Sequence, residues 1–199
     1  DGPGNLAEAA RDLGAYLVHI STDYVFDGSK GSPYREDDPV CPLGVYARSK
    51  AEGERRLRDL LSDNHCIVRT QWLFGLHGHN FVETILRLAS THQTLTVVDD
   101  QHGTPTYTLD LASALKCLCE RRYRGTIHVT NSGQTTWYDF AKEILREAGV
   151  TGVRVEPIPS TKLDRPAPRP AYAVLDNSRF AACTRAPLRP WQEALAHYL

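Results

Sequence analysis

Residues 19–50 read HISTDYVFDGSKGSPYREDDPVCPLGVYARSK, and this stretch decides the fold. It continues a short apolar run, Ala15 to Ile20, which is typical of a buried parallel strand. Ser21-Thr22-Asp23 follow at the strand end, where doubly wound sheets place their ligands. Pro and Gly then mark a loop, and Tyr46 to Lys50 open a charged amphipathic helix. The stretch therefore predicts an α/β fold with a site at the end of this strand.

Tyr46 and Lys50 are four residues apart, so on a helix both side chains point to the same side. A free tyrosine has a pKa of about 10, and an ammonium group one turn away favours the phenolate. The Thr22 hydroxyl can hold a substrate oxygen beside such a phenol. A Tyr-x-x-x-Lys spacing also arises by chance on helix surfaces, but here it follows a strand with a Ser-Thr tip. Together these residues predict proton transfer in a carbonyl/alcohol interconversion, with the hydride left to a cofactor.

Several further segments resemble one family, the extended short-chain dehydrogenase/reductases, and within it the dTDP-4-dehydrorhamnose reductases. The resemblance covers nearly the whole chain. Each motif is weakly specific by itself, but the motifs are specific in combination. The matching segments are Ser21–Gly28, Pro33–Glu36, Val45-Tyr46, Ser49-Lys50, Arg69-Thr70, Trp72, Gly75, Asn80-Phe81, Val97–Gln101, Gly103–Thr106, Asp110–Ala112, Trp137-Tyr138, Phe140-Ala141, Arg169-Pro170 and Leu175-Asp176.

The resemblance implies a function. An NAD(P)H-dependent enzyme of this kind reduces the 4-keto group of dTDP-4-dehydro-L-rhamnose to give dTDP-L-rhamnose, a sugar of bacterial cell-surface polysaccharide. The implied catalytic residues are Thr22, Tyr46 (the proton donor) and Lys50. The implied cofactor-binding residues are Ser21, Tyr46, Lys50, Arg69 and Thr70. The implied substrate-binding residues are Asp23, Tyr24, Phe26, Trp72, Asn80, Phe81, Gln101, Thr104 and Arg169.

For two of these residues, a purely structural role is as good an explanation as ligand binding. Asn80 equally suits a helix cap, and Arg169 equally suits an exposed loop position. Two alternatives to the reductase also stay open: an epimerase of the same superfamily, and a non-catalytic subunit like the regulatory subunit of methionine adenosyltransferase. Dehydratases of the superfamily carry Asp-Glu after the threonine, whereas Tyr24 follows Asp23 here. Gly44 stands where the family usually has asparagine, which removes an amide near the site.

No glycine-rich phosphate loop of the form G-x-G-x-x-G follows a strand in this sequence. The family carries that loop on its first βα turn. By resemblance we expect the chain to begin roughly three βα units into the fold, on the order of 90 residues at about 30 residues per unit. Residues 1–75 and 107–130 are then the remainder of a Rossmann-like cofactor domain. Residues 76–106 and 131–199 form a smaller α/β lobe for the sugar nucleotide.

The composition fits an ordinary globular protein. The chain is 41% hydrophobic and 24% charged with a formal net charge of −1, which argues against a nucleic-acid partner. No apolar run approaches the ~20 residues that span a bilayer. Five cysteines without C-x-x-C spacing favour reduced thiols and a cytoplasmic location. No metal ligands are assigned: His77 and His79 suit a loop, and no glutamate is matched to the Mg²⁺ that some family members bind. The sequence leaves open whether the protein forms a homodimer.

The remaining periodicity predicts helices and strands around the site. Expected helices are 5–13, 48–61, 80–89, 109–120, 137–148 and 191–199, with Thr135 or Thr136 as the cap of the fifth. Expected strands are 66–70 with 72–74 as its extension, 95–98, 126–130 and 153–157. Residues 158–170 contain four prolines and predict an extended loop.

Overall fold

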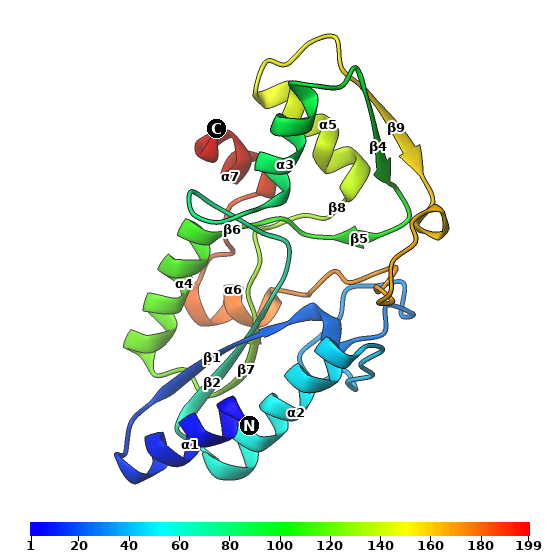
Figure 1. The fold of residues 1–199 in the computed structure, drawn as a ribbon. Helices are drawn as coiled ribbons and strands as arrows, with labels where there is room; N and C mark the ends of the chain where they lie inside the picture. The colour runs from blue at the N-terminus through cyan, green and yellow to red at the C-terminus, as the bar shows by residue number, and fades with distance from the viewer.

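The computed structural model describes residues 1–199 and places a three-stranded parallel sheet in one half of the molecule (Figure 1). Its order is β1-β2-β7, with bounds Leu17–Thr22, His65–Thr70 and Gly125–His128. All six residues of the central strand, β2, are buried. The register pairs Thr22 with Thr70, so the ends of β1 and β2 lie side by side. The predicted α/β fold with a parallel sheet is confirmed.

Helices cover both faces of this sheet. On one face lie α1 (Gly2–Asp12) and α2 (Val45–Leu60), which also pack against each other. On the other lie α4 (Thr108–Arg121) and α6 (Ser178–Thr184). A core of eight buried residues joins that second pair to the strands: Cys66, Val68, Leu111, Ala114, Leu118, Ile127, Val129 and Phe180. Burial on both faces explains the continuous apolar run Cys66-Ile67-Val68 in the middle of β2.

The other half is a smaller α/β lobe with a larger aromatic core (Figure 1). Strand β4 (Thr94–Val98) pairs in parallel with β9 (Arg154–Ile158). Three helices pack around this pair: α3 (Phe81–Ala89), α5 (Trp137–Glu147) and α7 (Trp191–Tyr198). Short strands lie between the two halves: β3 (Leu73–Phe74) with β6 (Thr106–Tyr107), and β5 (His102–Gly103) with β8 (Thr135–Thr136). Two 3₁₀ turns, η1 (Asp23–Val25) and η2 (Ser160–Lys162), complete the elements.

The expected elements form, with ends shifted by a few residues, and two differences stand out. Residues 72–74 do not extend β2: Trp72 has a φ of 47°, which turns the chain so that β3 pairs with β6 instead. Helix α6 was not expected, because its seven residues are too few for a clear apolar period. Its Phe180 belongs to the core of the main sheet, so the chain returns to that half within residues 131–199.

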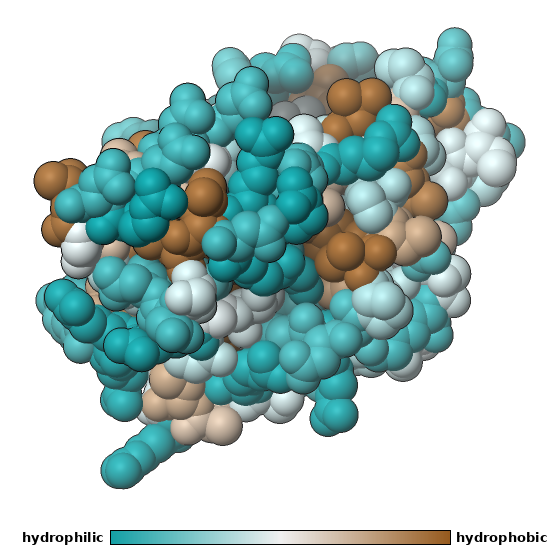
Figure 2. Space-filling model, turned by 90° about the horizontal axis from the view of Figure 1, so that it is seen from below, coloured by the Kyte–Doolittle hydropathy of each residue, from teal (hydrophilic) through white to brown (hydrophobic).

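Exposed apolar side chains interrupt a hydrophilic surface. Leu6 and Leu13 on α1 and Val45 on α2 are among them. Figure 2 shows separate apolar patches among hydrophilic residues on the face seen from below. Strand β1 has a partner strand on one side only. No helix of the structure combines the length and the apolar character needed to cross a membrane.

Candidate active site

A cavity of about 400 Å³ lies where β1 and β2 end. The rest of its wall comes from helix α2, the turn η1, the start of β3, the first residue of α5 and the loop before α6. Most of the predicted catalytic and cofactor-binding residues are brought together here. The lining residues are Ile20, Ser21, Thr22, Asp23, Tyr24, Tyr46, Lys50, Thr70, Gln71, Trp72, Leu73, Trp137 and Arg169. Parallel α/β sheets place their ligands at this edge, so the cavity is the candidate active site, and we call it the polar cavity.

Thr22 and Asp23 sit at the tip of β1, where the strand turns into η1. The Thr22 hydroxyl accepts a hydrogen bond from the backbone N–H of Tyr24, at 3.2 Å, and so caps the turn. It also shares a hydrogen bond of 2.9 Å with Oδ1 of Asp23. Burial raises the pKa of Asp23 to about 7, and the hydrogen bonds from Thr22 and from the local backbone only partly oppose this. The tip of the strand thus pairs a hydroxyl with a carboxyl that titrates near neutrality.

Tyr46 and Lys50 reach the cavity from the first turns of α2. Tyr46 is 56% exposed, and its ring meets that of Tyr24 edge to face at 5.9 Å. The Lys50 ammonium donates a hydrogen bond of 2.6 Å to the carbonyl oxygen of Ile20. Burial lowers the pKa of Lys50, with the Glu54 carboxylate opposing. Since an ammonium has three N–H donors, Lys50 ties α2 to the end of β1 and keeps donors for a ligand.

Two stacked tryptophans form the opposite wall. The rings of Trp72 and Trp137 lie 3.6 Å apart between centroids, with 15° between their planes. Trp72 was predicted as a substrate residue, whereas Trp137 was seen only as part of a matching segment. Gly103 makes room for the pair, because a Cβ there would come within 2.5 Å of the Trp72 ring. The stack therefore requires a residue without a side chain at position 103.

A second cavity of about 400 Å³ adjoins the first, sharing Trp137 and Arg169 with it. We call it the apolar cavity, since most of its wall comes from α3 and β4. Its lining residues are Phe81, Thr84, Ile85, Leu88, His92, Thr94, Leu95, Thr96, Val97, Val98, Trp137, Leu163, Arg165 and Arg169. Arg165 and Arg169 come from residues 159–170, which follow β9 and which we call the proline-rich loop. Burial together with the charge of Arg169 lowers the pKa of Arg165. Two guanidinium groups beside an apolar cavity suit an anionic ligand with a flat apolar end.

The structure does not bring Arg69 or Phe26 into the polar cavity. Arg69 is only 1% exposed, and its guanidinium makes two hydrogen bonds to the Glu54 carboxylate, at 2.9 and 2.7 Å. Phe26 is stacked on Tyr34 beneath that guanidinium, with ring centroids 4.2 Å apart. Both side chains therefore hold the fold together on the α2 side of β2.

Three further predicted residues also lie outside both cavities. The Asn80 side chain caps α3 by accepting from the backbone N–H of Glu83, at 3.1 Å, and it donates to the carbonyl oxygen of Gly75. Thr104 is buried and donates to the carbonyl oxygen of Gly133, at 2.8 Å. Gln101 is buried without lining either cavity. Of the two roles left open for Asn80, the cap is the one that the structure displays.

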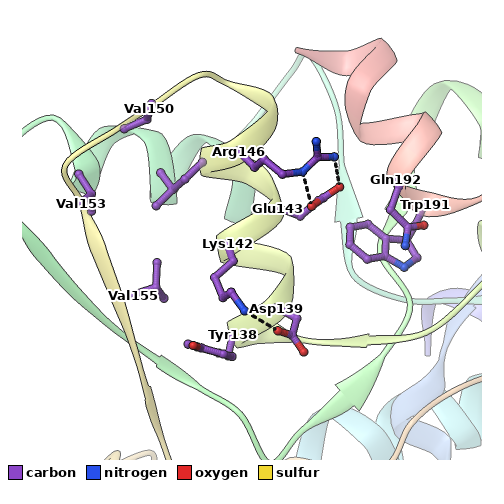
Figure 3. Close-up of a pocket in the computed structure, with 11 residues that line it drawn as sticks. Tyr138, Asp139, Lys142, Glu143, Arg146, Val150, Val153, Val155, Trp191 and Gln192 are labelled. Carbon is purple, nitrogen blue, oxygen red and sulfur yellow. Dashed lines mark hydrogen bonds and ion pairs between the residues drawn. The ribbon is translucent and has the colours of Figure 1, made fainter.

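A larger hollow of about 570 Å³ lies on α5, between β9 and the start of α7 (Figure 3). It shares no lining residue with the polar cavity. Its charged groups are paired with one another: Lys142 with Asp139 at 3.3 Å, and Arg146 with Glu143 at 2.6 Å. Nothing there resembles a set of catalytic groups.

The polar cavity offers hydrogen-bonding atoms that the protein itself leaves unused. Thr70 Oγ1, Gln71 Oε1 and Asp23 Oδ2 are buried and have no partner. Such atoms are uncommon in folded proteins, and they fit a polar ligand such as the carboxamide and ribose of a nicotinamide cofactor. Gln71 was not predicted from the sequence. No group of three or more His, Cys, Asp or Glu side chains is arranged to hold a metal ion.

Proteins with a similar sequence and fold are known. A dTDP-4-dehydrorhamnose reductase from Streptomyces griseus is 49% identical over 98% of this chain, which spans just under two thirds (66%) of that relative. A solved dTDP-4-dehydrorhamnose reductase from Clostridium acetobutylicum is 45% identical with a TM-score of 0.94, over 99% of this chain and 69% of that one. One from Bacillus anthracis, solved in complex with NADP, is 37% identical with a TM-score of 0.93, over the same shares.

These relatives support the predicted Rossmann-like fold. The family described as the RmlD substrate binding domain matches residues 1–199, and the chain therefore belongs to that family.

Proposed function

We propose that this chain carries the catalytic centre and sugar-nucleotide site of an NAD(P)H-dependent reductase, which converts dTDP-4-dehydro-L-rhamnose to dTDP-L-rhamnose. The observation that carries the proposal is the meeting of Thr22, Tyr46 and Lys50 in one cavity at the ends of β1 and β2. Relatives bearing that name, 49% and 45% identical, support the same reaction. We place the protein in the cytoplasm, in keeping with its free cysteines.

The side chains in the polar cavity are suited to the proton transfer that accompanies hydride transfer in a carbonyl reduction. A bound nicotinamide cofactor supplies the hydride. Tyr46 donates its phenolic proton to the oxygen of the former 4-keto group, so that the C=O bond becomes H–C–O–H. Thr22 hydrogen-bonds the same oxygen and orients it. Lys50, Ser21 and Thr70 hold the nicotinamide side of the cofactor, using the free ammonium donors and the unused Thr70 hydroxyl.

The neighbouring groups suit the nucleotide end of the substrate. The apolar cavity accepts the base, against the apolar side chains of α3 and β4. Arg165 and Arg169 bind the diphosphate, for which guanidinium groups are matched in charge and geometry. The stacked face of Trp72 and Trp137 then lies between the two cavities, where the sugar passes. Base, diphosphate and sugar are thereby laid out in the order in which they are bonded.

The test is oxidation of NADPH and of NADH in the presence of dTDP-4-dehydro-L-rhamnose. It is made on the 199-residue chain and on a form extended by the upstream sequence of its gene. We expect substrate-dependent oxidation in the extended form. Tyr46→Phe removes the proton donor and should lower kcat by about a hundredfold or more, as general-acid groups contribute. Leu43→Ala, which changes the loop before α2 and no proposed catalytic group, is the matched control.

The other outcomes each identify a different function. Rearrangement of a dTDP-sugar without net consumption of NADPH would replace the reductase by the epimerase alternative. Cofactor binding without turnover of any dTDP-sugar would replace it by a binding subunit, and the search would move to a protein partner.

A further inference from the structure

The Thr22 hydroxyl has limited hydrogen-bonding capacity, and the protein uses most of it. A hydroxyl has one proton and two lone pairs. The Tyr24 N–H, at 3.2 Å, occupies one lone pair. The Asp23 carboxyl, 2.9 Å from the hydroxyl oxygen, takes a second position. What Thr22 can offer to a ligand in the polar cavity therefore depends on which of the two groups, Thr22 or Asp23, donates in their shared hydrogen bond.

Asp23 is placed so that it can be either donor or acceptor. It is 3% exposed, its Oδ2 has no partner, and it takes part in no ion pair. The charged and titratable groups around the same cavity are Tyr46 and Lys50 on α2, Tyr24 in the same turn and Arg169 from the proline-rich loop. None of these side chains forms a hydrogen bond or an ion pair with the Asp23 carboxyl, whose hydrogen bonds come from Thr22 and from the backbone of residues 23 and 24. Burial without a countercharge favours the neutral acid and raises the pKa of Asp23 to about 7.

The protonation state of Asp23 determines whether the Thr22 hydroxyl donates a hydrogen bond to a ligand or accepts one from it. An ionised Asp23 can only accept, so the Thr22 proton points to Asp23, and Thr22 can only accept from a ligand. A protonated Asp23 can donate its own O–H to Thr22 Oγ1. The Thr22 proton is then free to turn into the cavity and donate to a ligand oxygen. A ketone oxygen needs a donor, whereas an alcohol can donate to an acceptor.

We propose that Asp23 is a positioning residue that sets the direction of the Thr22 hydroxyl, with the protonated acid favouring ketone reduction and the carboxylate favouring alcohol oxidation. This inference rests on the proposed reductase function and assigns Asp23 a role through Thr22 instead of direct contact with the sugar. Asp23 gives up no proton in the reaction, since Tyr46 supplies the proton and the cofactor the hydride.

The first test compares pH profiles of the form of the protein that turns over in the assay described above. For wild type, kcat/KM for ketone reduction should fall above a pKa near 7, by up to tenfold per pH unit, and kcat/KM for oxidation of dTDP-L-rhamnose should rise over the same range. Asp23→Asn replaces the acid by an amide that can donate to Thr22 at every pH. We expect this variant to keep reduction within about threefold of the wild-type value at pH 6 and to lose the inflection near pH 7 in both directions.

A double-mutant cycle separates action through Thr22 from a general effect on the site. Thr22→Val removes the hydroxyl and keeps the shape of the side chain. If Asp23 acts through Thr22, Asp23→Asn should leave the remaining activity and pH profile of Thr22→Val unchanged. An equal shift of the profile in both backgrounds would overturn the inference. So would an unaltered inflection in Asp23→Asn itself.

A third measurement reads the protonation of Asp23 without turnover. The carboxyl carbons of ¹³C-aspartate-labelled protein are titrated by NMR, and the signal missing from Asp23→Asn is assigned to Asp23. We expect its titration near pH 7. A carboxyl that stays ionised down to pH 5 would overturn the inference and leave the reductase function standing. Absence of sugar reduction at every pH would instead overturn the reductase function, and this inference with it.

Discussion

At the residue scale, a buried ion pair between Arg69 and Glu54 links helix α2 to the central strand. Burial raises the pKa of Glu54, but the hydrogen bonds and charge of Arg69, helped by Arg58, outweigh it, so the pKa lies below its ordinary value. Both side chains are almost fully buried, and they tie α2 to the central strand. The same residue type could have served a ligand, as the family resemblance suggested for Arg69. In the structure Arg69 is paired with Glu54 on α2 instead, and no local sequence pattern reveals that partner.

Removing one member of this pair should destabilise the protein strongly. Glu54→Gln leaves the guanidinium of Arg69 buried without a countercharge, which costs about 3–5 kcal/mol in comparable cases. Urea unfolding followed by circular dichroism measures the loss. Glu52→Gln is the matched control, since Glu52 lies on the same helix but pairs with Arg55 and Arg56 on the protein surface, and its replacement should leave the midpoint unchanged. Equal midpoints for both variants would contradict the structural role of the pair.

The acid next to Thr22 predicts a stability that depends on pH. Because the pKa of Asp23 is raised in the folded state, the folded protein binds this proton more tightly than the unfolded chain. The stabilisation is fully present below about pH 4, the unfolded pKa, and it is lost as the pH rises through the folded value of about 7. The free energy of unfolding of wild type minus that of Asp23→Asn should therefore decrease between these limits, by at most about 1.4 kcal/mol per pH unit. A difference that is constant from pH 4 to pH 7.5 would contradict the raised pKa.

At the element scale, the six predicted helix ends lie within one residue of the observed ends, whereas α1 and α2 start three residues earlier than predicted. Two of the starts were predicted from a capping residue. Thr136 caps α5 by accepting from Asp139 N–H, and Asn80 caps α3 in the same way. Both follow from local rules, because a short polar side chain before an apolar period is enough to start a helix. The strand ends near the site were also predictable. The turn at Trp72 was not, since its positive φ depends on contacts with Trp137 and on the absence of a side chain at Gly103.

The cap at Asn80 can be separated from a role in binding. Asn80→Ala should lower the free energy of unfolding by about 1 kcal/mol and leave KM for the sugar nucleotide unchanged. Asn80→Asp keeps an oxygen for the Glu83 N–H and should recover most of that stability. Thermal unfolding and steady-state kinetics on the same samples decide between the roles. A rise in KM in both variants with no loss of stability would restore Asn80 as a substrate residue.

At the scale of the whole molecule, the two cavities predict a ligand preference. Ligands that bind only the folded state raise its stability by about 2.7 kcal/mol at a hundred times their Kd. We expect dTDP to raise Tm more than thymidine does, because only dTDP reaches Arg165 and Arg169. Arg169→Gln should remove most of the difference between the two ligands. Equal shifts from dTDP and thymidine in wild type would contradict the diphosphate role of the loop.

The overall arrangement also shows what the sequence could not supply. The main helices and strands, the parallel sheet and the edge that carries the site could be predicted from local patterns, whereas α6 and the short strands between the two halves could not. The adjacency of the apolar cavity to the polar one could not. It depends on Trp137 and Arg169, which lie far apart in sequence and far from Tyr46.

The path of the chain between the two halves has a consequence for its modular use. The C-terminal thirty residues are anchored in both halves: Leu175 bridges to Tyr34, α6 packs on the main sheet, and α7 packs in the smaller lobe. A protease that nicks the proline-rich loop, 159–170, would thus leave two fragments that stay associated. Because the chain passes back and forth between the halves, neither half is encoded by one continuous gene segment. The loop that carries Arg165 and Arg169 is continuous, and both of its ends are held in place by packed elements. We therefore expect that this loop can be exchanged between related proteins without disrupting the fold of either half.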